Sequence, residues 1–145
     1  MCAHLFQNRR NRRVLSGASP ADETAVRSYE RGTVELAEQR QLRGAKNQSL
    51  FREVNEQIKG VTHMTYIDFL CECADMDCTE IIALRSEEYE EVRKYPERFP
   101  IKHGHQVDEI ERVVGEYERY IVVEKIELSA DVARRLNPRE RGLNG

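Results

Sequence analysis

Three of the four cysteines of the chain lie within eight residues, in the stretch C-E-C-A-D-M-D-C. Cys71 and Cys73 share one side of an extended segment, and Cys78 follows after a short loop, so that a bend can bring the three sulfur atoms together. Zinc takes four nitrogen or sulfur ligands in a tetrahedron, which suits such spacing. The carboxylates of Asp75 and Asp77 add negative charge that favours a cation. The cluster therefore predicts one structural Zn²⁺ ion.

His105 is the residue that we expect as the fourth ligand. Gly104 precedes it, and glycine allows the tight turn that would bring the histidine back to the cysteines. His103 and His63 are the alternatives, together with a water molecule. His103 precedes the Gly104 turn and His63 precedes the first expected strand, so both are less favoured than His105.

Other uses of the three cysteines stay open at this point. They could be core residues, a redox pair of Cys78 with Cys71 or Cys73, or a catalytic thiol assisted by His105. The pattern lacks the C-x2-C at a helix N-terminus that usually lowers a thiol pKa. A catalytic cysteine needs an orienting residue and an oxyanion loop, and we identify neither. A structural metal ion is favoured, because four protein ligands close its coordination shell.

The elements on either side of the cluster indicate a β-hairpin with the cysteines at its tip. Residues 65–72 and 79–85 are rich in β-branched and aromatic side chains and are predicted to be its strands. Ser86 is expected to cap a helix over 86–95, which has acidic residues in its first turn and basic residues in its last. Hairpin carboxylates such as Glu72 and Glu80 are expected to be solvated.

The C-terminal part predicts a second hairpin and a last helix. Residues 98–105 are expected to be extended, 109–117 and 119–128 to form the hairpin, and Ser129 to cap a helix over 129–136. The segment 109–117 also fits helical spacing, but Gly115 favours a strand. Short strands and helices without β-α-β alternation indicate a small α+β domain.

The N-terminal third differs from the rest of the chain in its composition and in its expected structure. Residues 1–20 contain four arginines between Arg9 and Arg13 and few apolar groups, which predicts a disordered basic arm. Such an arm could bind nucleic acid through phosphates, but no aromatic residues are interleaved with the arginines for stacking on bases. Residues 21–47 are predicted to be a helix and a linker that includes Gly44. The domain itself is expected to span 48–139, with a frayed tail at 140–145.

A second upstream helix is expected between Ser49 as its cap and Gly60 as its C-terminal glycine. Phe51, Val54 and Ile58 form a narrow apolar stripe along it, and we expect this stripe to dock on the domain.

Composition and charge limit the function. Residues 1–50 carry a net charge of +4 and residues 51–145 a net charge of −7, so the expected domain lacks the basic surface of a nucleic-acid module. No apolar run is long enough to cross a membrane, and the N-terminus lacks the pattern of a secretory signal. We therefore expect a cytoplasmic protein, in which clustered cysteines usually bind metal or act in redox chemistry.

Several short motifs occur in a fixed order: FREVNEQI, CECADMDCTE, EYEEVR, ERF, HGH and YIVVEK. In this order they resemble a family of small uncharacterised proteins from high-GC Gram-positive bacteria. The resemblance covers about two-thirds of the chain, from residue 47 to 139, and implies no activity. The chain has His103 where the family pattern has a proline before the glycine.

The sequence thus predicts a non-enzymatic, zinc-stabilised interaction or regulatory module with an unidentified protein partner. The alternative is a small metal-dependent or thiol-redox enzyme that uses Cys71, Cys73 and Cys78. We find no phosphate-binding loop, dinucleotide fingerprint or hydrolase motif that would favour an enzyme.

Overall fold

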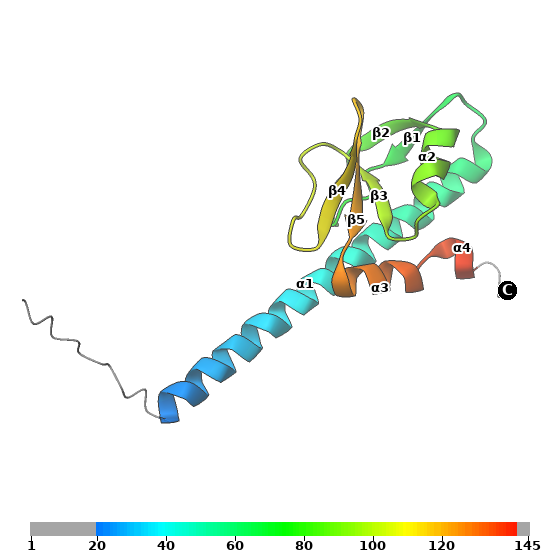
Figure 1. Cartoon of the computed structure of the whole chain (residues 1–145). Coiled ribbons are helices and arrows are strands. Elements are labelled where there is room, and N and C mark those ends of the chain that lie inside the picture. The colour runs from blue at the N-terminus through cyan, green and yellow to red at the C-terminus, as the bar shows by residue number, and fades with distance from the viewer. Residues whose placement is uncertain (1–19, 142–145) are drawn as a thin grey trace, which may run out of the picture. The chain divides into compact units, whose positions relative to one another are not determined.

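The computed structural model describes residues 20–141, and side chains from residue 23 onward. Its elements, in chain order, are α1 (Pro20–Val61), β1 (Tyr66–Leu70), β2 (Ile81–Arg85), α2 (Ser86–Arg93), β3 (Arg98–Ile101), β4 (Glu111–Glu116), β5 (Ile121–Lys125), α3 (Glu127–Arg135) and α4 (Pro138–Arg141) (Figure 1). The α+β class is as predicted. The basic arm with Arg9–Arg13 lies outside the described residues. Within residues 20–141, none of the helices combines the length and the apolar character that a membrane span needs.

Both predicted hairpins are present as antiparallel pairs. β1 pairs with β2 in a two-stranded sheet, and the cysteine segment connects them. β5 is the central strand of a second sheet, between β3 and β4. Residues 111–116 are therefore a strand, and the register of β4 shifts between Val113 and Gly115.

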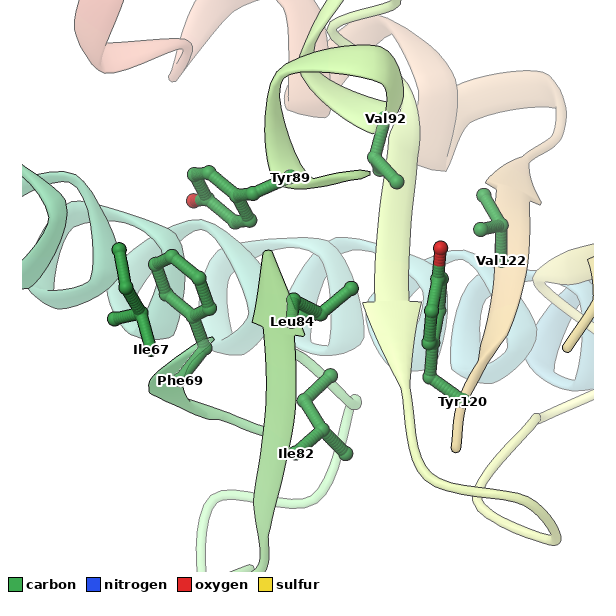
Figure 2. Packing of buried hydrophobic residues seen from close by; sticks show 8 residues of the cluster. All are labelled: Ile67, Phe69, Ile82, Leu84, Tyr89, Val92, Tyr120 and Val122. Atoms are coloured by element: carbon green, nitrogen blue, oxygen red, sulfur yellow. The ribbon is translucent and has the colours of Figure 1, made fainter. Parts of the chain in front are cut away.

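Strand β5 separates two clusters of buried hydrophobic residues. Figure 2 shows the first, which consists of Ile67, Phe69, Ile82, Leu84, Tyr89, Val92, Tyr120 and Val122. In it the rings of Phe69 and Tyr89 stack with centroids 4.3 Å apart. Ile121 and Val123, on the other face of β5, belong to the second cluster, which also contains Cys71 and Cys73. Successive residues of β5 therefore alternate between the two clusters.

Helix α1 corrects the N-terminal predictions. The chain divides into two compact units at Thr33/Val34. The second unit, Val34–Gly145, contains both sheets, the helices α2 to α4 and the part of α1 from Val34 onward. The predicted linker at 43–47 is helical, and Ser49 and Gly60 lie inside the helix rather than at its ends. Gly44 serves a close approach, because a Cβ there would lie 2.6 Å from Ile110 Cδ1.

The face of α1 that docks on the domain is polar. Of the predicted stripe, Ile58 packs against the first cluster, whereas Val54 is 39 % exposed. The buried side chains of α1 are that of Ala45 and the polar ones of Gln48, Ser49, Arg52 and Asn55, all at most 4 % exposed. The prediction followed apolar spacing and missed this face, because its partners in the domain are polar as well.

Two predicted helix caps and the tail also need correction. The cap of α2 is Arg85, whose backbone N–H donates to Glu88 Oε2 at 2.8 Å, and not Ser86. Ser129 lies inside α3, where its hydroxyl donates to the carbonyl of Ile110 at 2.8 Å. Residues 138–141 form α4, in which Arg139 is held by carboxylates of α1 and α2, so residues 140 and 141 of the predicted frayed tail are helical. The rest of that predicted tail, 142–145, lies outside the described residues.

Candidate metal centre

Cys71, Cys73, Cys78 and His105 lie together, with one donor atom of each within 4.8 Å of all the others. Cys71 directly follows β1, and Cys73 and Cys78 lie in the loop that leads to β2. His105 comes from the segment after β3, so that two parts of the chain separated by 27 residues meet here. Cys71 and Cys73 are 1 % exposed, and Cys78 and His105 are half-buried.

The distances suit a tetrahedral ion of the size of zinc. His105 Nδ1 lies 3.5 Å from Cys71 Sγ and 3.6 Å from Cys78 Sγ. Around zinc, with a Zn–S distance of about 2.3 Å and a Zn–N distance of about 2.0–2.1 Å, the tetrahedral angle separates sulfur from nitrogen by about 3.5 Å. The donor set of three thiols and one imidazole is also one that zinc commonly takes. The residues present therefore fit such an ion.

A glycine turn places His105. Its backbone N–H donates to the carbonyl of Lys102 at 3.1 Å, and Gly104 at the third position of this turn has φ +84°. A positive φ at that position defines a type II turn and favours glycine. His103 at the second position instead lies with Nε2 2.6 Å from the carbonyl oxygen of Tyr117. Of the three candidate histidines, His105 alone belongs to the cluster, because His103 is engaged elsewhere and His63 is exposed.

The loop between the cysteines is fixed by its own backbone. Cys71 N–H donates to the carbonyl of Glu80 at 2.9 Å, and Cys78 N–H donates to that of Asp75 at 3.2 Å. Asp75 also accepts the N–H of Asp77 on its carboxylate at 3.0 Å, as in an Asx-turn. Asp75 and Asp77 are thus not part of the donor cluster, and the carboxylate of Asp75 shapes the loop.

The thiols differ in how readily they lose a proton. A hydrogen bond from Cys71 lowers the pKa of Cys73 to about 5, against the effect of burial. The same bond, and then burial, raise the pKa of Cys71. The backbone N–H of Lys102 donates to Cys71 Sγ at 3.2 Å and favours the thiolate there. Binding of a metal ion would displace the remaining protons, because zinc binds thiolates.

Glu72, between two of the cysteines, is completely buried, and the expectation that it is solvated was wrong. Its carboxylate accepts hydrogen bonds from Arg52 Nε at 3.1 Å, Asn55 Nδ2 at 3.0 Å and Tyr89 Oη at 2.9 Å. Alternation along the segment places it on the side opposite the cysteine sulfurs, where α1 and α2 lie. Glu80 is exposed, as predicted, and pairs with Lys102.

Arg52 connects this carboxylate to the rest of the domain. It donates to the backbone carbonyls of Pro96 and Arg98, and its guanidinium lies 3.7 Å from the centroid of the Phe99 ring. Burial lowers the pKa of Arg52, and the nearby charge of Glu72 opposes that shift. The sequence carries one signal for this role: Gln48, Arg52 and Asn55 have helical spacing, although the face they form is polar.

A second buried carboxylate faces α1. Glu111 lies with Oε2 2.9 Å from Lys125 Nζ, and both side chains are completely buried. Gln48 Nε2 donates to Glu111 at 3.1 Å, and the backbone N–H of Val107 donates to it at 2.8 Å. Burial lowers the pKa of Lys125. The polar face of α1 therefore docks on two buried acids, Glu72 and Glu111.

We compared the chain with protein-family models, curated proteins and solved structures. No protein-family model, no curated protein and no solved structure matches the chain. The resemblance of its motifs to a family of small bacterial proteins therefore stays a prediction.

Proposed function

We propose that the chain is a non-enzymatic, zinc-stabilised interaction module in which Cys71, Cys73, Cys78 and His105 bind one Zn²⁺ ion. The observation that carries the proposal is the convergence of these four donor atoms to within 4.8 Å. The ion would join the end of β1 to the segment after β3. Its binding energy would then contribute to folding, because the ligands converge only in the folded chain.

A structural ion is favoured over a catalytic one. A catalytic zinc site keeps an open position for water or substrate, whereas four protein ligands close the shell. Two carboxylates next to the ligands in sequence are also engaged, since Glu72 accepts three hydrogen bonds and Glu80 pairs with Lys102. Neither of these two is free to act as a general base, which favours the structural role.

The setting that we propose is the cytoplasm of a bacterium, with a protein as the partner. Cys71, Cys73 and Cys78 are free of disulfides and available as ligands. Thiols stay reduced in the cytoplasm, which suits a site that needs three thiolates. The net charge of −7 over residues 51–145 favours a protein partner over nucleic acid for the domain.

Metal analysis of the full chain tests the proposal. We expect close to one equivalent of zinc in protein purified reduced and without chelator, and loss of that zinc in Cys71→Ser. Titration with a chromophoric chelator should release zinc only as the protein unfolds. Well under half an equivalent of any transition metal would overturn the metal site. Zinc that exchanges readily and binds inhibitors while the protein stays folded would indicate an open, catalytic site instead.

A further inference from the structure

We infer that helix α1 is part of the metal centre: Asn55, Arg52 and Asn47 position the ligand segment 70–74, so that zinc binding and docking of α1 strengthen each other. The inference rests on the proposed zinc site. It assigns these residues a positioning role, since none of them belongs to the cluster of donor atoms.

The bonds from α1 alternate with the ligands along the chain. Asn55 pairs with the backbone of Leu70, accepting its N–H at 2.8 Å and donating to its carbonyl at 2.9 Å. Arg52 donates to the side chain of Glu72 at 3.1 Å. Asn47 donates to the carbonyl of Ala74 at 2.8 Å. Residues 70, 72 and 74 are thus held by α1, and the cysteines between them are left to face the metal.

This arrangement solves a geometric problem of the C-x-C pattern. Side chains two residues apart on a regular strand stand about 6.5–7 Å apart. The sulfurs of Cys71 and Cys73 lie within 4.8 Å, so the segment must bend toward the metal side. The bonds to Glu72 from α1 and α2, and its own N–H donated to the carbonyl of Pro100 at 3.1 Å, hold that bend from the opposite side. The protein therefore maintains the ligand geometry through its own contacts.

The docking of α1 depends on the same bonds. Most of its buried side chains are polar, namely Gln48, Ser49, Arg52 and Asn55, and the apolar contribution comes from Ala45 and the partly buried Ile58. A buried polar face is stable only while its partners are in place, since an unpaired buried polar group is costly. Displacement of Glu72 would leave Arg52 and Asn55 without their common acceptor.

Linkage makes this dependence reciprocal. If the bonds from α1 raise the affinity for zinc by a given factor, zinc stabilises the docked helix by the same factor. Residues that orient metal ligands from outside the coordination shell typically change metal affinity by about 10–100-fold. Loss of the ion would then weaken the docking of residues 44–59 of α1. The helix would therefore be more firmly docked in the metal-bound protein than in the metal-free protein.

The test uses the full chain and two variants of different severity. Glu72→Gln removes the charge that Arg52 neutralises, and Asn47→Ala removes a single bond to the metal loop while keeping a good helix former. Val92→Ala is the control, because Val92 is buried in the first cluster and is neither a hydrogen-bond partner of Glu72 nor a member of the donor cluster. It destabilises the fold by packing alone.

We expect zinc affinity, measured by chelator competition on folded protein, to fall at least tenfold in Glu72→Gln and severalfold in Asn47→Ala, and to stay within twofold in Val92→Ala. If Glu72→Gln does not fold, Asn47→Ala decides. Hydrogen exchange supplies the second readout: zinc should slow exchange of amides 44–58 in the parent, and slow it less in Asn47→Ala.

Two results would overturn the inference while leaving the zinc site intact. One is an unchanged zinc affinity in the folded variants, and the other is a rate of amide hydrogen exchange in α1 that is the same with and without zinc. Equal losses in Val92→Ala would also overturn it, since general stability would then explain the effect. If the parent binds no zinc at all, the proposed function fails first, and this inference fails with it.

Discussion

Arg52 Nε lies 3.1 Å from Glu72 Oε2, and the two side chains are 1 % and 0 % exposed. Removing one partner of a buried ion pair leaves an uncompensated charge in the interior and costs about 3–5 kcal/mol. We therefore expect Arg52→Ala to lower the free energy of unfolding by about that much in urea denaturation at equal zinc loading. The exposed pair of Lys94 and Glu91 is the control, and Lys94→Ala should have a much smaller effect, because solvent screens an exposed pair. Equal effects of the two variants would contradict the assignment of the buried pair.

Two glycines of α1 should respond in opposite ways to alanine. At Gly44 a Cβ would lie 2.6 Å from Ile110 Cδ1 and 3.3 Å from Ala74 Cβ, and such overpacking costs about 1–3 kcal/mol. At Gly32 nothing lies within 4 Å, so alanine gains up to about 1 kcal/mol from helix propensity. Thermal unfolding should show Gly44→Ala less stable and Gly32→Ala at least as stable as the parent. A stabilising Gly44→Ala would mean that α1 does not approach the domain this closely.

Substitution of Gly104, in the turn before His105, should weaken zinc binding without causing a steric clash. Gly104 has φ +84°, and a Cβ at this position would meet no atom within 4 Å, so the cost of Gly104→Ala lies in the backbone alone. That conformation costs a residue with a Cβ about 1–2 kcal/mol. Because His105 is placed by this turn, we expect weaker zinc binding by roughly tenfold in chelator competition. Gly60→Ala, inside α1 and also in open space, should leave zinc binding unchanged.

The ionised carboxylate of Glu90 is expected to stabilise the folded chain, and this contribution should be lost at acidic pH. Hydrogen bonds from Arg139, with further help from Lys59, lower the pKa of Glu90 to about 2. In the unfolded chain a glutamate titrates near pH ~4.3. A depressed folded-state pKa gives stability that is present above the unfolded pKa and is lost as the pH falls toward the folded one. Denaturation between about pH 5 and about pH 2 should therefore be less pH-dependent in Glu90→Gln than in the parent.

The control for this prediction lies on the same helix. Glu87 is exposed and forms none of the ion pairs found between residues 23 and 141. Glu87→Gln is therefore the matched variant that removes one carboxylate of α2 without removing an ion pair. An unchanged slope in Glu90→Gln would show that the bonds from Arg139 and Lys59 do not stabilise the charged carboxylate in solution.

The donor cluster and the strands could be predicted because each depends on local pattern. The spacing of Cys71, Cys73 and Cys78 and the glycine before His105 were enough to bring the four residues together in the prediction. The β-branched and aromatic residues on either side of the cysteine loop likewise predicted the strands that became β1 and β2.

What the sequence did not reveal was the polar interface of α1. Apolar spacing pointed to Phe51, Val54 and Ile58, whereas the docked face contains Arg52 and Asn55. A buried arginine is recognisable only together with its acceptor. That acceptor, Glu72, lies 20 residues away, and as a hairpin carboxylate it was expected to be solvated. Gly44 was assigned to a linker for a related reason. In the structure it lies inside α1, close to Ile110, and this long-range contact cannot be recognised from the local sequence.

X-ray absorption at the zinc edge of the full chain would identify the ligands of the ion. We expect three sulfur ligands at about 2.3 Å and one nitrogen at about 2.0–2.1 Å, with the sulfur count falling to two in Cys78→Ser. His103→Ala should leave the spectrum unchanged, because Nε2 of that histidine lies against the carbonyl of Tyr117. A shell of four sulfurs, or one composed only of oxygen and nitrogen, would contradict the site formed by Cys71, Cys73, Cys78 and His105.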